Sequence, residues 1–327
     1  MAANAKCNFA KKKQAIAKMK KGVRIVNCAR GGLVIEADLA DAIKSGHVAG
    51  AGFDVFEVEP ATDSPLFGLP NVVCTPHLGA STSEAQENVA LQVAEQMSDY
   101  LLKGAVTNAI NMPSISAEEA PRLKPFVTLA DVLGGFVGQV TESAIKEVEI
   151  LYEGSTAEMN TKALTSAVLA GLIRTQVADV NMVSAPIMVK ERGIVLSEIK
   201  RDKSGVFDGY IKLTVKTENN TRSVAGTCFA DGKPRFIQIK GINLDAEVGR
   251  NMVYTTNADA PGIIGLLGTV FGDAGVNIAN FQLGRNKAGG DAIALLYVDA
   301  PVADNVLDLV RANKEIQSAK PLVFNVD

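Results

Sequence analysis

Two apolar runs near the start of the chain have the pattern of buried parallel strands. Residues 23–29 (VRIVNCA) and 49–56 (AGAGFDVF) are nearly continuously apolar, as parallel strands are when both faces of their sheet are covered. The segment between them, 36–46, has helical periodicity and ends at Gly46. This order predicts a β-α-β unit, whose strands place their carboxyl ends on one edge, where open α/β sheets bind ligands.

A third strand and a long helix extend this region. Residues 71–77 (NVVCTPH) predict the strand, and 81–104 predict the helix, with Ser81 or Ser83 as its N-cap and Glu84 at capping-box spacing. Three strands are fewer than a doubly wound sheet usually has. We therefore expect part of a doubly wound α/β sheet, covered on both faces, in a truncated domain.

The rest of the chain predicts two α+β regions after a proline-rich linker at 107–125. In the first, helices over 123–140 and 157–170 enclose a strand at 144–154, and antiparallel strands follow at 209–218, 221–232 and 233–247. In the second, the order is β-α-β-β-α-β, which is the ferredoxin-like split βαβ. The predicted domains are 1–112, 113–251 and 252–327.

Composition excludes several classes of protein. The net charge of −3 gives no reason to expect nucleic acid, and the basic run between Lys11 and Lys20 is interpreted as a solvated helix face. There is no long apolar segment and no signal peptide, so we expect a cytoplasmic protein without membrane contact. The cysteines lack CxxC spacing, which predicts no disulfide and no metal site, and Cys28 and Cys74 are expected to be buried.

Candidate catalytic side chains gather at the predicted strand ends. Arg30 is followed by Gly31 and Gly32, which suits a carboxylate clamp that a ligand can approach closely. The alternative is an ion pair of Arg30 with Glu36 or Asp38, although the helix dipole explains those two carboxylates better.

The chain has two histidines. His77 ends the third strand on the same edge as Asp54, so it is either a base oriented by Glu57 or Glu59 or a histidine that only binds backbone. His47 is interpreted as polar turn surface.

The motifs NCARGGLV, AGAGFDVFEVEP and NVVCTPHLGASTSEAQENVA resemble the D-2-hydroxyacid dehydrogenase family. The resemblance extends from about residue 18 to 327 and is to the long-form members that oxidise 3-phosphoglycerate with NAD, the first step of L-serine biosynthesis. It implies that Arg30 holds the substrate carboxylate, that His77 is the general acid/base, and that Glu59 pairs with His77. Asp54 would face the nicotinamide, and the backbone of residues 28–30 and 77–80 would line the cofactor (Cys28, Ala29, Arg30, His77, Leu78, Gly79, Ala80).

The same resemblance implies that the first region is the C-terminal part of a Rossmann-type parallel sheet, and it gives expectations for the two C-terminal regions. The middle one is similar to an intervening, allosteric substrate-binding domain, and the last one to an ACT regulatory domain. L-serine would bind there at Asn257, Asp259 and Asn277. A homo-oligomer is expected, with the apolar strand AIALLYV (292–298) in its core.

The sequence departs from the family in one respect. It contains no GxGxxG strand-turn-helix and no acidic residue placed to bind the ribose. We therefore expect an incomplete long-form member of this family that oxidises little 3-phosphoglycerate with NAD on its own. The alternative is a non-enzymatic, amino-acid-binding regulatory protein built on the two C-terminal domains, and a third interpretation is a dehydrogenase of another 2-hydroxyacid.

Overall fold

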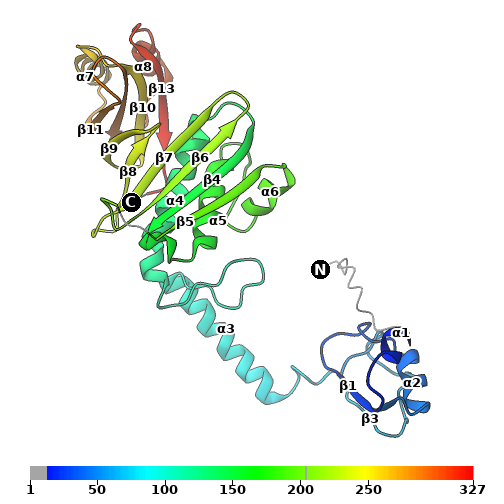
Figure 1. Ribbon diagram of the computed structural model, residues 1–327. Coiled ribbons are helices and arrows are strands. Elements are labelled where there is room, and N and C mark those ends of the chain that lie inside the picture. Colours follow the sequence, from blue (N-terminus) through cyan, green and yellow to red (C-terminus); the bar gives the residue numbers. More distant parts are fainter. Residues whose placement is uncertain (1–12, 203–204, 327) are drawn as a thin grey trace. The chain divides into compact units, whose positions relative to one another are not determined.

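The computed structural model describes residues 13–202 and 205–326, which fall into two compact units (Figure 1). Unit 1 runs to Glu95 and unit 2 from Gln96 onward. Each unit is considered by itself. Unit 2 contains both of the regions that were expected to be separate domains, and the boundaries proposed at 112 and 251 stay predictions.

Unit 1 is built on a parallel sheet of three strands. β1 (Val23–Asn27), β2 (Val48–Phe53) and β3 (Val72–Cys74) lie in the order β1-β2-β3. The helices α1 (Lys13–Ala17) and α2 (Glu36–Lys44) contact each other, and α2 packs on β2. The β-α-β prediction is thus confirmed, and it brings the carboxyl ends of the strands to one edge.

The expectation that both faces of this sheet are covered is wrong for the described residues. Val26 and Val73 are 74% and 68% exposed, whereas Ile25 and Phe53 are buried with Leu39 of α2 in the core of the unit. The two helices account for one face only. A run of apolar residues predicts a buried strand, but it does not say which element covers it.

The long helix α3 (Ser83–Lys103) begins differently from the prediction. Its cap is Thr82, whose Oγ1 accepts a hydrogen bond from the Ala85 N–H at 3.1 Å, and Ser81 instead donates to the His77 carbonyl. None of the residues of α3 is buried in the part of the chain that the structure describes.

The main body of unit 2 is a six-stranded sheet with two long helices on one face (Figure 1). The strand order is β5-β4-β6-β7-β8-β9. Its elements are α4 (Ala120–Val140), β4 (Ile145–Gly154), η1 (Ser155–Ala157), α5 (Thr161–Ile173), α6 (Ala185–Glu191), β5 (Val195–Arg201), β6 (Gly209–Thr217), β7 (Thr221–Cys228), β8 (Pro234–Ile239) and β9 (Ile242–Glu247).

Two features of this sheet were not predicted. The stretch 233–247 is two strands, because the chain turns at Lys240 and Gly241, which both have positive φ angles of 51° and 78°. Strand β5 and helix α6 were not anticipated, and β5 pairs with β4 in parallel, unlike the other strands of the sheet.

The C-terminal region has the predicted split βαβ order. β10 (Asn251–Ala258), α7 (Ile263–Asp273), β11 (Ile278–Arg285), β12 (Asp291–Val298), α8 (Asp304–Arg311) and β13 (Ile316–Val323) follow one another, with the sheet order β11-β12-β10-β13.

The central strand β12 is already buried within the chain. Ala294 and Leu296 pack with α7 and α8, while Ile293 and Leu295 join the core of the six-stranded sheet. The expectation that AIALLYV forms the core of a dimer is therefore wrong, because the folded chain itself covers both of its faces.

Candidate active site

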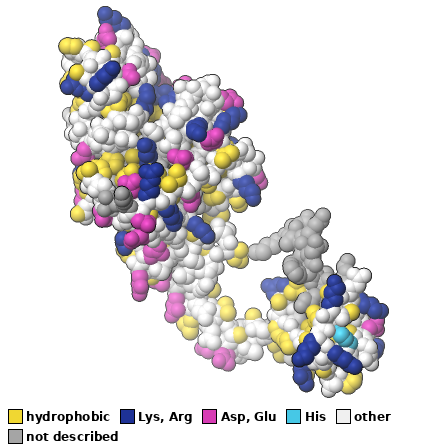
Figure 2. All heavy atoms as spheres, in the orientation of Figure 1, with side chains coloured by type: hydrophobic (Ala, Val, Ile, Leu, Met, Phe, Trp, Pro, Cys, Tyr) yellow, Lys and Arg dark blue, Asp and Glu magenta, His cyan; other side chains and the backbone are white. Residues whose placement is uncertain are grey.

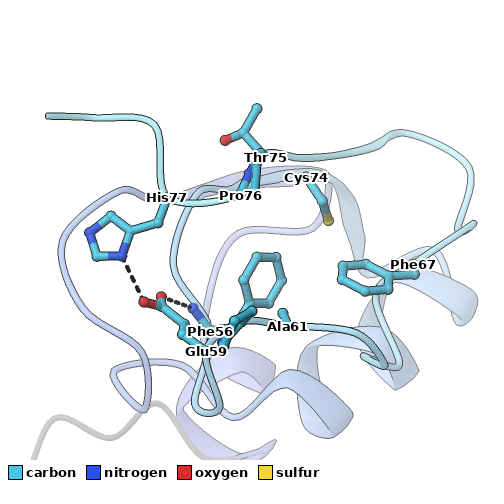
Figure 3. A pocket seen from close by; sticks show the side chains of 9 residues that line it. Phe56, Glu59, Ala61, Phe67, Cys74, Thr75, Pro76 and His77 are labelled. Carbon is cyan, nitrogen blue, oxygen red and sulfur yellow. Dashed lines mark hydrogen bonds and ion pairs between the residues drawn. The ribbon is translucent and has the colours of Figure 1, made fainter. Parts of the chain in front are cut away.

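His77 and Glu59 form a hydrogen-bonded pair at the end of β3. His77 Nδ1 lies 2.7 Å from Glu59 Oε2, and the other oxygen of Glu59 accepts the Phe56 N–H at 2.9 Å (Figure 3). The Phe56 N–H, and after it His77, hold the pKa of Glu59 below its usual value. A carboxylate that stays ionised and fixed at both oxygens orients the imidazole, since Nδ1 is committed to Glu59 and Nε2 is left for a ligand.

Asp54 holds the backbone on which His77 stands. Its Oδ1 accepts hydrogen bonds from Thr75 Oγ1 (2.6 Å) and the Leu78 N–H (2.7 Å), and its Oδ2 accepts the Gly79 N–H (2.9 Å). These donors, Thr75 above all and then Leu78, lower the pKa of Asp54. His77 itself has a φ of 58°, in the left-handed region that non-glycine residues seldom occupy. Because Asp54 binds the next two N–H groups, it stabilises this conformation.

The loop of Arg30 is held by Asn27, the last residue of β1. Asn27 is buried, its Nδ2 donates to the Arg30 carbonyl at 3.0 Å, and its Oδ1 accepts the Ala29 N–H at 3.2 Å. The Arg30 guanidinium donates to the Ala29 carbonyl at 2.7 Å. No ion pair joins Arg30 to Glu36 or Asp38 among the described residues.

Gly31 and Gly32 are explained by packing and turn geometry, whereas the sequence predicted that they let a ligand approach closely. A Cβ at Gly31 would lie 1.8 Å from the Phe56 carbonyl oxygen, so this glycine lets the Arg30 loop pack on the backbone just before Glu59. Gly32 has a φ of 77°, which favours glycine at the turn. The two loops are therefore in contact through Gly31, whereas among the described residues no hydrogen bond joins the Arg30 guanidinium to His77 or Glu59.

A cavity of about 520 Å³ opens beside His77 and Glu59. Figure 3 shows the rings of Phe56 and Phe67 and the thiol of Cys74 along its wall. The two rings meet edge to face with their centroids 5.4 Å apart. Burial is the main cause that raises the pKa of Cys74. The cavity thus has an apolar wall and the hydrogen-bonded His77–Glu59 pair at one side.

Several sequence-based expectations for this region need correction. Cys28 is exposed, because it follows the end of β1 and lies in the open loop. Glu36 has a role beyond its interaction with the helix dipole. Its carboxylate accepts hydrogen bonds from the Glu57 N–H (2.9 Å) and the Ser64 hydroxyl (2.5 Å), and it thereby holds the loop that carries Glu59. His47 is half-buried, and its Nε2 lies 3.1 Å from the Ile16 carbonyl.

Asn27, Thr75 and Glu36 were missed as residues that position the site. The signal for Asn27 was a polar residue at the end of an apolar strand, which is a common start for a side-chain-to-backbone turn. Thr75 and Glu36 have long-range partners that the sequence does not indicate.

The three proposed effector residues are engaged within the chain. Asp259 accepts hydrogen bonds from Arg285 and the Gly289 N–H, both at 2.9 Å, which lower its pKa with the Gly289 N–H as the larger cause. Asn277 donates to Asp299 at 2.7 Å. Asn257 lies inside β10 rather than in a loop, is 1% exposed, and its Oδ1 has no hydrogen-bond partner in the described structure.

Within residues 13–202 and 205–326, no group of His, Cys, Asp or Glu side chains could hold a metal ion, and no helix is long and apolar enough to cross a membrane. In the face that Figure 2 shows, basic and acidic side chains are interspersed over unit 2.

Comparison with known proteins finds matches for two segments of the chain. Residues 2–79 match the D-isomer specific 2-hydroxyacid dehydrogenase family, NAD binding domain, and residues 122–240 match the D-3-phosphoglycerate dehydrogenase intervening domain. The chain is 41% identical over 310 residues to the D-3-phosphoglycerate dehydrogenase of Bacillus subtilis and 38% identical over 311 residues to that of Methanocaldococcus jannaschii. This chain is a homologue of the D-3-phosphoglycerate dehydrogenases.

The homology covers 94% of this chain but 59% and 58% of the two dehydrogenases, so the chain spans about three fifths of their length. Among solved structures, a glyoxylate reductase from Paecilomyes thermophila is 37% identical over 34% of this chain and 34% of its own, with a TM-score of 0.30. The two family matches and the two dehydrogenase relatives confirm the resemblance inferred from the three motifs.

Proposed function

We propose that the chain carries the acid–base centre of a cytoplasmic, NAD-dependent dehydrogenase that oxidises 3-phosphoglycerate to 3-phosphohydroxypyruvate, the first step of L-serine biosynthesis. The observation that carries the proposal is the His77–Glu59 pair, with 2.7 Å between Nδ1 and Oε2, beside a cavity at the carboxyl edge of the sheet. The homology to D-3-phosphoglycerate dehydrogenases supports the substrate.

His77 is the group that takes the proton of the C2 hydroxyl. With Nδ1–H donated to Glu59, the Nε2 lone pair faces outward and can accept that proton. The imidazolium that forms is stabilised by the ionised Glu59. In the reverse direction the same nitrogen returns the proton to the substrate oxygen.

Arg30 would bind the substrate carboxylate. One of its N–H groups is donated to the Ala29 carbonyl, and a guanidinium has five N–H donors, so a bidentate pair remains available. Its charge is permanent, so it stabilises negative charge on the substrate oxygen without competing for the proton.

The residues present fit the nicotinamide end of NAD. Among the described residues, one hydrogen bond to Asp54 Oδ2 is formed, from the Gly79 N–H, and a carboxylate oxygen can accept a second one, which suits an amide N–H. NAD, when bound, supplies the acceptor for the hydride that leaves C2. No glycine-rich turn for the pyrophosphate occurs in the 327-residue sequence, and such a turn contributes much of the dinucleotide affinity in this fold.

The proposal is tested by NADH formation from 3-phosphoglycerate and NAD. The purified chain alone is expected to give little or no NADH, because its cofactor affinity is weak. Mixing it with a polypeptide that contains the unmatched two fifths of the B. subtilis dehydrogenase is expected to give turnover.

His77→Ala should lower the rate of that mixture by roughly 10²–10⁴-fold. His47→Ala is the matched control, because it removes the other histidine of the chain and should leave the rate unchanged. Turnover that is insensitive to His77→Ala contradicts the assigned role, and a well-folded mixture without turnover contradicts the enzymatic proposal.

We also propose that the C-terminal region is an ACT regulatory domain of a homo-oligomer and binds L-serine at Asp259, Asn277 and Asn257. The buried Asn257 Oδ1, which has no hydrogen-bond partner among the described residues, supports a polar ligand there, and Asp259 would receive the ammonium group. Isothermal calorimetry with L-serine should give saturable heat that Asp259→Asn removes. No heat at millimolar serine contradicts this proposal, and D-serine is the control ligand.

A further inference from the structure

Strand β5 is an edge strand that the described chain leaves unprotected. It pairs with β4 on one side, and no described residue forms a ladder with its other side. Six of its seven residues are exposed and Ile199 is partly buried. Val195 and Leu196 are 62% and 38% exposed. A strand of this length with unpaired backbone groups is a template for another strand.

Charged side chains usually protect such an edge, but on β5 the opposite charges of Glu198 and Lys200 are placed in a self-complementary way. The sequence V-L-S-E-I-K-R-D, residues 195–202, has Glu198 and Lys200 on either side of Ile199. Glu198 accepts a hydrogen bond from Thr165 of α5 at 2.5 Å. The side chains with even numbers therefore lie on the helix-covered face of the sheet.

We propose that β5 pairs antiparallel with β5 of a second copy of this chain, with the two-fold axis at Ile199. Residues directly opposite each other in an antiparallel pair lie on the same face with Cβ atoms about 4.5–5.5 Å apart. This register therefore places Glu198 opposite Lys200 of the other copy twice, and Ser197 opposite Arg201 twice. The two sheets become one continuous sheet with their helices on the same side.

Other symmetric registers are less favourable. An axis at Glu198 or Lys200 places two like charges opposite each other, which is destabilising. An axis at Ser197 avoids that repulsion, but it places Glu198 opposite Leu196 of the other copy. This register therefore lacks the opposite-charge pairs that the axis at Ile199 provides. A closed two-fold pair also uses up the β5 edge of both copies, so pairing through β5 does not propagate into a fibre.

The test is a set of charge reversals measured by sedimentation equilibrium on the full chain. Glu198→Lys and Lys200→Glu each create two like-charge pairs across the axis, so each should weaken the self-association that β5 mediates by about tenfold or more. Mixed in equal amounts, the two variants restore both opposite-charge pairs, and so does the double variant by itself.

Lys190→Glu is the matched control. It makes the same charge change on the neighbouring helix α6, where Lys190 is exposed, and it should leave association unchanged. Circular dichroism confirms that each variant is folded, which matters for Glu198→Lys because that change removes the bond to Thr165.

Recovery of association in the mixture and in the double variant supports the proposal, because loss of folding in a single variant could not be rescued by the other. Single variants that associate like the unchanged chain overturn it, and so do single variants whose defect persists in the mixture. Association through any other surface of the chain would be indifferent to all of these changes.

Discussion

The candidate site is held together by single side chains that bind backbone groups of neighbouring loops. Asn27 fixes the Arg30 loop, Asp54 fixes the His77 loop, and Glu36 fixes the loop before Glu59. Arg30 and His77 were predicted because polar residues at strand ends indicate chemistry, and the family resemblance selected Glu59 over Glu57. The sequence could not predict the supporting bonds of Asp54 and Glu36, because these connect residues that are more than 20 positions apart.

Asn27→Asp is expected to loosen the Arg30 loop. The aspartate keeps an acceptor for the Ala29 N–H but loses the donor to the Arg30 carbonyl. Misplacing a substrate-binding group by about 1 Å can reduce a rate by about 10²-fold. In the reconstituted NADH assay we expect KM for 3-phosphoglycerate to rise. Asn88→Asp on the exposed face of α3 is the control, and an unchanged KM in Asn27→Asp contradicts the assignment.

Asp54→Asn should destabilise unit 1 in a pH-dependent way. The pKa of Asp54 is lowered in the folded state, so its carboxylate stabilises the fold fully above the pKa of an unfolded aspartate, about 3.9. This stabilisation is lost as the pH falls through the lower folded value. Urea unfolding should show a stability gap between the unchanged chain and Asp54→Asn at neutral pH that narrows below pH ~4. A gap that stays constant with pH contradicts this account.

Most elements were predicted, and the failures have specific causes. Strand β5 was missed because L-S-E-I-K-R has neither an apolar run nor clean alternation, and it is a strand because β4 pairs with it. The close approach of α4 and α5 was also not predicted. A Cβ at Gly134 would lie 2.0 Å from the Val168 carbonyl oxygen, so glycine is required where the two helices touch.

Gly134→Ala and Gly135→Ala should have opposite effects on stability. At Gly134 the added methyl group overlaps the backbone of α5, and overpacking costs about 1–3 kcal/mol or more. At Gly135 the nearest atoms are side-chain carbons of Phe324 at 3.8 Å, so the alanine fits, and its helix propensity favours it by up to about 1 kcal/mol. Urea denaturation measures both. Equal effects would show that helix contact does not require Gly134.

At the scale of the whole molecule, both sheets of unit 2 were predicted apart from β5 and the division of 233–247 into two strands, but their shared core was not. Phe136 of α4 packs against Phe236 of β8 and Tyr254 of β10, with ring centroids 5.3 and 5.2 Å apart. Phe324, just after β13, completes the group at 5.9 Å from Phe236. Periodicity identifies such residues as buried in their own element, yet it does not say which sheet they meet. The two regions are therefore expected to unfold together.

Differential scanning calorimetry should resolve one transition for unit 1 and another for unit 2. Phe324→Ala removes a ring from the shared core, a loss of about 3–5 kcal/mol, so it should lower the transition of unit 2 for both of its sheets. Leu39→Ala, at a fully buried position of unit 1, should lower the other transition. If Phe324→Ala instead splits the unit 2 transition into two, the C-terminal sheet folds independently and the shared core does not couple the regions. Gln139 is a second link to test, because its side-chain amide accepts the Val323 N–H at 2.8 Å and donates to the Val323 carbonyl at 3.0 Å, which fixes β13 to α4.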